Sequence, residues 1–419
     1  MVHPESASTP PPTEGNLPWL ADPTALTALL PPLDEVEHRP VDDCVSGVRL
    51  CRATNWKAAA KVIRCGGVPY YEYGELAASR ITSCTPQHLR ILCTVDDDDP
   101  DNPAVHWNKG HLLYQITYAL DAVNFYFRWA GKSMCVSLEA GDSVFSLPFV
   151  PHSFAVRDRE STSVLVFTYP GSLVGNVRHE LSALGYDTTC GFAMVPGSDS
   201  YGPLLWSFLD ALAMPPAEVR RQSGLPANRV AAILAGQSDP SLAELASLAN
   251  VLDVNVRDLL PLKTHTRDGI QVVRAAEAMR WQYPDIDRPA YAITRLASDP
   301  LHPHTTPLDL RVLDTVNGGH TWLTTYQHQY IYVLGHSAVR FRWQRGGAEY
   351  VTKLHPGDTA YIQPGVPVQF GSTTGSIARL LLLRTADAMS ADLRFAIGAM
   401  PSEGLMRYCG GPLADFQVG

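Results

Sequence analysis

The chain has 419 residues, of which 45% are hydrophobic and 18% are charged. This is enough apolar material for folded cores, and the length predicts two or three domains. The 42 acidic residues outnumber the 33 basic ones, so the formal net charge of −9 does not indicate a general nucleic-acid-binding surface. The longest aliphatic run, Leu380–Leu383, is far shorter than the roughly 20 residues that span a bilayer, so no membrane helix is expected.

The N-terminal segment lacks the basic start and apolar stretch of a secretory signal. Its three consecutive prolines at 10–12, flanked by Ser, Thr and Glu, are typical of a disordered leader, which we place at 1–40. The eight cysteines include no C-x-x-C pair and are too few for a disulfide scaffold. These features favour a cytoplasmic protein whose reduced cysteines serve as small buried hydrophobic residues.

A long internal repeat divides the chain. Val123–Trp129 (VNFYFRW) is echoed by 339–343 (VRFRW), with the final Trp displaced by 214 positions. GDSVFSLPFVPH, starting at Gly141, is echoed by GDTAYIQPGVPV at an offset of 216. This Gly-Asp, Pro and His pattern resembles the second conserved motif of the cupins, which are jelly-roll barrels. The repeat therefore predicts a mainly β bicupin.

Short β-rich runs separated by turn residues support this architecture. The expected strands are 115–120, 123–129, 133–138, 143–148 and 163–169 in the first copy, and 330–334, 338–343, 349–354, 358–363 and 378–384 in the second. We expect the first cupin at 41–195, an α-helical module at 196–262 and the second cupin at 263–419.

The intervening module resembles the helix-turn-helix of phage repressors. Segment 204–214 is apolar at helical spacing, Pro215 opens a helix that Gly224 ends, Pro226 opens the next and Ser241 caps a third. Segment 215–261 carries four basic and five acidic residues, which does not favour phosphate contacts. We therefore favour a packing or dimerisation module over DNA binding.

Three side chains of the first copy form a candidate metal site. His111 and Gln115 are four residues apart, so on one strand they share a face, and His152 follows the Gly-Asp turn on a facing strand. Three ligands with open positions suit non-haem Fe(II) and O₂. The alternatives are two core histidines and a Gln115 amide bonded to the barrel wall.

The second copy serves as an internal control for this interpretation. His152 aligns with Val368, and His111 aligns with Thr325, although the turn residues are kept. The barrel itself therefore does not require the histidines. We expect a metal in the first barrel, a second barrel that lacks metal ligands, and surface or structural roles for His328 and His336.

Four segments together carry a more specific resemblance: RCGGVPYYEYGEL (64–76), ILC (91–93), NKGH (108–111) and FVPHSF (149–154). In order and type they resemble the hydroxyethylphosphonate dioxygenase and methylphosphonate synthase family, over about residues 45–385. The resemblance implies a bicupin with one Fe(II) in its first barrel, O₂ as cosubstrate and no 2-oxoglutarate.

The resemblance also implies the ligand set. It makes His111 and His152 iron ligands. Some members use a Glu six residues before the second His, where this chain has Ser146. The methylphosphonate synthase branch uses a Gln four residues after the first His, which is Gln115 here. A two-His, one-Gln iron site is the resulting prediction.

The same resemblance implies that Arg64, Tyr73 and Asn108 contact the phosphonate. An Arg fork matches its oxygens, and Tyr and Asn add directed donors. Family members also supply a Lys from a helical region outside the barrel, which we cannot assign to one of the six lysines here.

The resemblance implies O₂-dependent cleavage of 2-hydroxyethylphosphonate to hydroxymethylphosphonate and formate. A methylphosphonate synthase acting on the same substrate is the close alternative. The Ala-, Pro- and Arg-rich composition suggests a GC-rich bacterium and favours breakdown within a natural-product pathway such as antibiotic biosynthesis. A cupin-type DNA-binding regulator is the alternative of another class. The expected partner is the small phosphonate, without nucleic acid or membrane, and the helical module is the expected surface for self-association.

Overall fold

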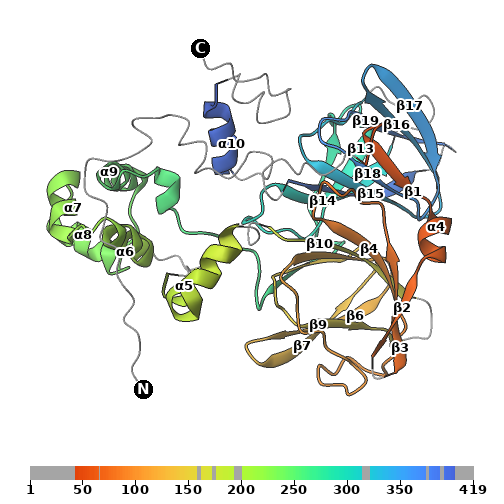
Figure 1. The fold of residues 1–419 in the computed structure, drawn as a ribbon, viewed down its shortest axis with the longest axis horizontal. Helices are drawn as coiled ribbons and strands as arrows, with labels where there is room; N and C mark the ends of the chain where they lie inside the picture. Colours follow the sequence, from red (N-terminus) through yellow and green to blue (C-terminus); the bar gives the residue numbers. More distant parts are fainter. Residues whose placement is uncertain are drawn as a thin grey trace, which may run out of the picture. The chain divides into compact units, whose positions relative to one another are not determined.

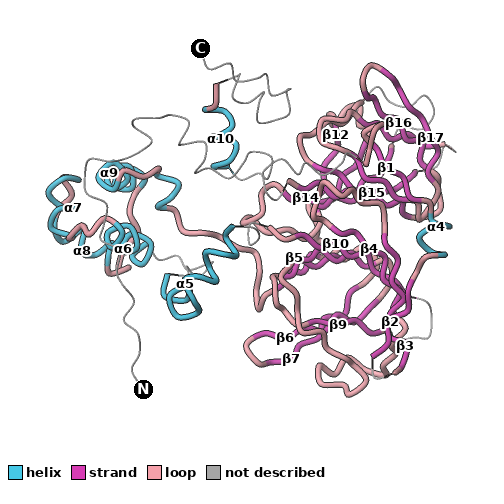
Figure 2. Tube along the Cα trace, in the orientation of Figure 1, coloured by secondary structure: helices cyan, strands magenta, loops and turns pink. Residues whose placement is uncertain are grey.

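The computed structural model describes residues 43–65, 67–157, 162–171, 176–192, 201–313, 321–373, 377–386 and 391–401. The leader expected at 1–40 lies outside these residues. In the described part of the chain, the named strands form two seven-stranded and two three-stranded sheets, with antiparallel pairing throughout. Strands dominate the two barrels, whereas most of the helices belong to the segment between them (Figures 1 and 2). The mainly β bicupin prediction is confirmed.

The first barrel joins a sheet of order β11-β8-β5-β10-β4-β3-β2 to a sheet of order β7-β6-β9 (Figure 1). Its strands are β2 (Lys61–Cys65), β3 (Val68–Glu75), β4 (Thr85–Ile91), β5 (Tyr114–Ala119), β6 (Val123–Trp129), β7 (Lys132–Leu138), β8 (Ser143–Ser146), β9 (His152–Ala155), β10 (Thr162–Tyr169) and β11 (Ile270–Val273). Alternate side chains of each strand point inward. Val144, Phe154 and Val166 belong to its apolar core.

The second barrel has the same plan, with sheets of order β1-β18-β15-β20-β14-β13-β12 and β17-β16-β19. Its strands are β1 (Val48–Cys51), β12 (Arg280–Tyr283), β13 (Tyr291–Arg295), β14 (Thr305–Val312), β15 (His328–Leu334), β16 (Val339–Arg345), β17 (Ala348–Leu354), β18 (Thr359–Ile362), β19 (Val368–Ser372) and β20 (Ala378–Thr385). All ten strand runs expected from the repeat are present, with shifts of a few residues at their ends.

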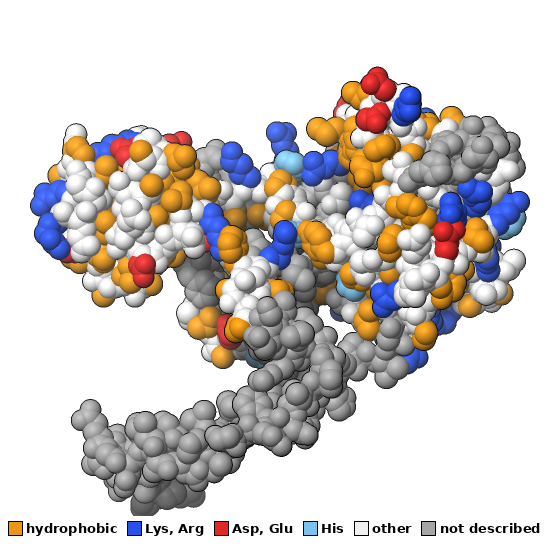
Figure 3. Space-filling view, turned by 90° about the horizontal axis from the view of Figure 1, so that it is seen from above, with side chains coloured by type: hydrophobic (Ala, Val, Ile, Leu, Met, Phe, Trp, Pro, Cys, Tyr) orange, Lys and Arg blue, Asp and Glu red, His pale blue; other side chains and the backbone are white. Residues whose placement is uncertain are grey.

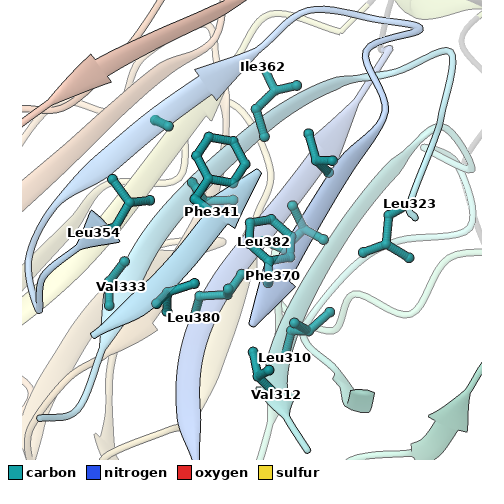
Figure 4. Close-up of a cluster of buried hydrophobic side chains, with 14 of the residues drawn as sticks. Leu310, Val312, Leu323, Val333, Phe341, Leu354, Ile362, Phe370, Leu380 and Leu382 are labelled. Carbon is teal, nitrogen blue, oxygen red and sulfur yellow. The ribbon is translucent and has the colours of Figure 1, made fainter. Parts of the chain in front are cut away.

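The second barrel is filled by its own side chains. The buried cluster includes Phe341, Phe370, Leu380 and Leu382, and Figure 4 shows these side chains pointing toward one another between the strands. Val368, the counterpart of His152, is fully buried in this cluster. Apolar side chains therefore occupy the position at which the first barrel carries an imidazole.

The two barrels exchange edge strands. β1 pairs with β18, so a strand within the expected first cupin completes the sheet of the second. β11 pairs with β8, so a strand within the expected second cupin completes the sheet of the first. The linear division at 195 and 262 does not describe these two strands, because sheet pairing connects segments that are far apart in sequence.

Matching ion pairs fix the exchanged strands. Arg274, just after β11, donates to Asp142 Oδ2 at 2.7 Å, and Arg52, just after β1, donates to Asp358 Oδ2 at 2.8 Å. Burial alone would raise the pKa of each carboxyl, but backbone N–H donors and the arginine hold it below the ordinary value. A shared core that includes Tyr118 of β5 and Tyr330 of β15 packs the large sheets together.

The four helices expected between the barrels are confirmed: α6 (Tyr201–Ala211), α7 (Pro216–Ser223), α8 (Ala227–Leu234) and α9 (Leu242–Leu252). The helix α5 (Asn176–Phe192), within the segment expected to belong to the first cupin, and the 3₁₀ helix η1 (Val256–Leu259) were not expected. Elsewhere lie α4 (Ala53–Ala58) and α10 (Ala391–Ala399). Ser241 forms a capping box with Glu244 at the start of α9. The leucine-rich inner faces of α6 to α9 form a separate core.

Charge and hydropathy of the described residues show two further features. On the face in Figure 3, basic side chains are interspersed with acidic, hydrophobic and uncharged ones. None of the helices in the described residues combines the length and hydropathy that crossing a membrane requires.

Candidate metal centre

A cavity of about 460 Å³ opens at one end of the first barrel. The predicted residues Tyr73, Asn108, His111, Gln115 and His152 all line it. The remaining lining residues are Ile63, Cys65, Tyr71, Thr85, Gln87, Leu89, His106, Trp107, Leu113, Phe154, Val166 and Thr168. The structure thus brings five of the six predicted site residues to one place.

The loop before β5 carries His111, which corrects the expectation that His111 and Gln115 share a strand. The β5 ladder begins at Tyr114, and the chain before it turns against the segment leading into β9. Phe149 N donates to His111 O at 2.9 Å, and His152 N donates to Asn108 Oδ1 at 2.9 Å. These bonds hold the two histidine-bearing segments together.

Gly110 permits this close approach. Its φ of +73° lies in the left-handed region, and a Cβ there would come within 2.7 Å of the Phe149 backbone. A side chain at this position would therefore be strained and would push the two segments apart.

Backbone carbonyls fix both imidazoles in the form that a metal requires. His111 Nδ1 lies 3.1 Å from Leu113 O, and His152 Nδ1 lies 2.9 Å from Val150 O. Because a carbonyl can only accept, Nδ1 carries the proton in each ring, and the neutral ring has its lone pair on Nε2. The ring centroids are 5.4 Å apart with an interplanar angle of 86°, and both rings line the cavity.

Gln115 supplies an oxygen to the same point. Its Oε1 lies 3.2 Å from His111 Nε2, and the side chain is 3% exposed. Two atoms at this separation can both face one cation as neighbouring ligands. The donor set, two imidazole nitrogens and an amide oxygen, therefore fits a divalent metal such as Fe(II).

The described residues of the site include no carboxylate ligand. Asp and Glu are absent from the residues that line the cavity, and the described part of the chain holds no group of three or more His, Cys, Asp or Glu suited to a metal. The amide oxygen of Gln115 is thus the available third ligand. Burial lowers the pKa of His152 to about 4, so this imidazole is neutral near pH 7.

Two further predicted residues place polar groups at the same cavity. Asn108 Oδ1 accepts from two backbone amides, which directs Nδ2 to within 3.1 Å of His152 Nε2. Tyr73 donates its hydroxyl to Gln87 Oε1 at 2.7 Å. Burial raises the pKa of Tyr73, so its phenol remains a donor.

Arg64 is not brought to the cavity. Ile63 and Cys65 line the cavity, so alternation along β2 turns Arg64 to the other face, where its exposed guanidinium donates to Gly67 O at 3.0 Å. None of the described residues that line the cavity is a Lys or Arg. The phosphonate contact assigned to Arg64 remains a prediction that this geometry does not supply.

The sequence reasoning missed other polar residues near the ligands. Thr117 accepts a hydrogen bond from Gln115 Nε2 at 3.0 Å. The Tyr71 hydroxyl lies 3.0 Å from Ser153 Oγ and 3.4 Å from Phe154 O, and it can donate to either oxygen. A signal for Thr117 was present, because it follows Gln115 by two residues and so shares its face of β5.

Comparison with known proteins places this chain in a family. No protein-family model matches the chain. Methylphosphonate synthase from Nitrosopumilus maritimus is 30% identical over 371 residues, covering 87% of this chain and 79% of that protein. A Streptomyces albus 2-hydroxyethylphosphonate dioxygenase structure with substrate and Fe(II) bound is 43% identical, with a TM-score of 0.83, covering 88% of this chain and 83% of that one.

A variant 2-hydroxyethylphosphonate dioxygenase structure is more distant, at 21% identity and a TM-score of 0.70, covering 86% of this chain and 83% of that one, and it supports the fold alone. The similarity to the first two proteins extends over both barrels and the segment between them. The chain therefore belongs to the family that comprises methylphosphonate synthase and 2-hydroxyethylphosphonate dioxygenase.

Proposed function

We propose that the protein is a mononuclear non-haem Fe(II) dioxygenase that cleaves the C–C bond of 2-hydroxyethylphosphonate, giving hydroxymethylphosphonate and formate. The observation that carries this proposal is the convergence of His111 Nε2, His152 Nε2 and Gln115 Oε1 on one cavity. The 43% identical structure, named with this substrate and Fe(II), supports it. All the electrons that O₂ accepts come from the substrate, so no 2-oxoglutarate or other reductant is needed.

A bound Fe(II) would supply the centre at which substrate oxygens and O₂ meet and the one-electron chemistry that activates O₂. The protein holds this ion with three neutral donors from His111, His152 and Gln115. A neutral donor set leaves the full charge of the metal for a phosphonate, which carries up to two negative charges. Substrate binding and charge compensation are therefore coupled in this cavity.

The remaining cavity residues orient the substrate and limit water. Asn108 Nδ2 can donate to a substrate oxygen held near His152. The Tyr73 hydroxyl donates to Gln87 in this structure and would supply a second donor by turning from Gln87 to the substrate. Leu89, Phe154 and Val166 form apolar walls. Such walls keep water from the reacting atoms and strengthen the polar contacts inside.

Phosphorus NMR of a single reaction tests the proposal. Purified protein loaded anaerobically with Fe(II) is mixed with 2-hydroxyethylphosphonate and O₂, with a His152→Ala variant as the matched control. The expected result, in the wild type alone, is a hydroxymethylphosphonate signal in the phosphorus spectrum and a formate signal in the proton spectrum of the same sample. Unchanged substrate would refute the proposed reaction.

Methylphosphonate synthase activity is the second candidate, because the 30% identical curated relative carries that name. It begins from the same substrate, and the ligand set does not separate the two outcomes. A methylphosphonate signal in the same NMR experiment would identify it. The expectation of a natural-product pathway applies to the first candidate.

Partners beyond the substrate are also proposals. The comparisons give no support to a DNA-binding regulator, and the inner faces of helices α6 to α9 are accounted for by their own core. Self-association through this module is a further part of the proposal. Light scattering of the purified protein would establish whether it self-associates. Cytoplasmic location remains a prediction from the cysteines and the N-terminal sequence.

A further inference from the structure

The orientation of the Gln115 side chain decides whether it can bind a cation. A glutamine amide has an oxygen that accepts and an NH₂ group that only donates. Rotation by half a turn exchanges the two ends and would present the NH₂ group to the metal. A glutamine that binds a metal through its oxygen therefore needs an acceptor for its NH₂ group, a requirement that a carboxylate ligand, with two oxygens, does not have.

Thr117 is placed to be this acceptor. Its Oγ1 lies 3.0 Å from Gln115 Nε2, and Thr117 is fully buried. The bond holds the NH₂ end against the sheet, which leaves Oε1 directed at His111 Nε2, 3.2 Å away. Both side chains lie on the inner face of β5, where water cannot replace the bond without entering the barrel.

The second barrel has a glutamine at the equivalent position, but there the amide oxygen makes the hydrogen bond and the NH₂ group does not. Gln329 is the counterpart of Gln115, and Ile331 stands in the place of Thr117. Gln329 Oε1 accepts a hydrogen bond from Arg384 Nε at 3.1 Å, and Gln329 Nε2 is buried with no partner in the described structure. The barrel alone therefore does not impose the Gln–Thr pairing; it occurs in the barrel that has the histidines.

We propose that Thr117 is a positioning residue that holds the amide of Gln115 with its oxygen toward the metal. This inference rests on the proposed function only in assuming that the first barrel binds Fe(II). Hydrogen-bond partners of metal ligands contribute about 10–100-fold to metal affinity, so a loss of this size is expected when the Thr117 hydroxyl is removed.

The test measures the Fe(II) dissociation constant by anaerobic titration against a competing chelator. Thr117→Val removes the hydroxyl at nearly constant volume and should weaken Fe(II) binding about 10–100-fold. Thr117→Ser keeps the hydroxyl and should bind within about 3-fold of wild type. Thr117→Ala, which adds no volume, replaces the Val variant if that one does not fold.

Ser146→Ala is the matched control. Ser146 is the cross-strand neighbour of Gln115, and its buried Oγ has no hydrogen-bond partner in the described structure. Its removal should leave Fe(II) binding unchanged. Equal losses in Ser146→Ala and Thr117→Val would show a general packing effect and overturn the inference, as would wild-type affinity in Thr117→Val.

A double variant separates positioning from packing. In a Gln115→Glu background either carboxylate oxygen can face the metal, so Thr117→Val should cost much less than it does beside Gln115. An equal cost in both backgrounds would contradict the inference. Wild-type protein that binds Fe(II) but leaves 2-hydroxyethylphosphonate unchanged would refute the proposed reaction while the Thr117 comparison still stands.

Discussion

The two barrels share one arrangement of strands and differ in the side chains at the end where the first barrel has its cavity. In each barrel, a buried Asp that follows the turn Gly accepts a hydrogen bond from the backbone just after the exchanged strand. In each, a glutamine of the large sheet lies opposite the strand that follows this turn: Gln115 is opposite β8, and Gln329 is opposite β18. The first barrel places His152 where the second has Val368, and Ser146 where the second has Ile362. The arrangement of strands is therefore maintained independently of the site, and a few inward residues decide whether a barrel binds a ligand or fills itself.

The largest expected effect comes from making the first barrel resemble the second at one ligand. His152→Ala removes a nitrogen donor that is buried and held by Val150 O. Fe(II) binding should weaken by more than about 100-fold, because a direct ligand contributes more than the partners behind it. Turnover should be lost while the melting temperature changes little. Equimolar iron bound at wild-type affinity, measured by anaerobic titration, would be inconsistent with the assigned ligand.

The complementary change is made in the core of the second barrel. Leu382 is fully buried in the cluster of Figure 4, so Leu382→Ala should lower the free energy of unfolding by about 2–5 kcal/mol. Fe(II) affinity should be unchanged, because the cavity lies in the other barrel. Urea denaturation and metal titration of the same sample check both parts. A large loss of iron affinity would show that the barrels are not independent in this respect.

The loop that brings the histidines together should be sensitive to a single methyl group. Gly110→Ala requires a positive φ and a contact of 2.7 Å with the Phe149 backbone. We expect a cost of about 1–3 kcal/mol, together with weaker Fe(II) binding. Gly346→Ala is a suitable control, since its φ is also positive but no atom lies within 4 Å of the added Cβ. Equal iron affinities in the two variants would argue against the role of the close contact.

The smallest effects are expected at the ion pairs that the barrels share. Asp142→Asn and Asp358→Asn should each cost about 1–2 kcal/mol, with solvent screening reducing the effect because Arg274 and Arg52 are each 39% exposed. Both carboxyls have a pKa below the ordinary 3.8. Their stabilisation is thus complete above that value and is lost as the pH falls through the folded-state pKa. The free energy of unfolding should depend on pH in the same way in the two variants. A marked difference would show that the two ion pairs do not contribute equally to stability.

The sequence predicted the parts of the fold that depend on local pattern. Neighbouring residues alone predict the alternating strands, the Gly-Asp turns and the helix starts at Pro226 and Ser241. The structure contains all of these features. The exchange of β1 and β11 was not predicted, because pairing between distant segments leaves no local pattern. His111 was expected on a strand, whereas the β5 ladder starts only at Tyr114.

The site was predictable where the two copies could be compared. Loss of both imidazoles from the second copy identified His111 and His152, and spacing identified Gln115. The direction of Arg64 depends on which face of β2 turns toward the barrel, and a register shift between Ile63 and Arg64 hides that from the sequence. Thr117 was within reach of the same spacing argument.

The most direct test of the central claim is an anomalous difference map at the iron edge from crystals soaked anaerobically with Fe(II). One peak per chain is expected in the first barrel, bounded by the Nε2 atoms of His111 and His152 and by Oε1 of Gln115. The second barrel, filled by its apolar cluster, should show no peak. Absence of density at the three ligands, or an amide of Gln115 turned away from it, would contradict the account.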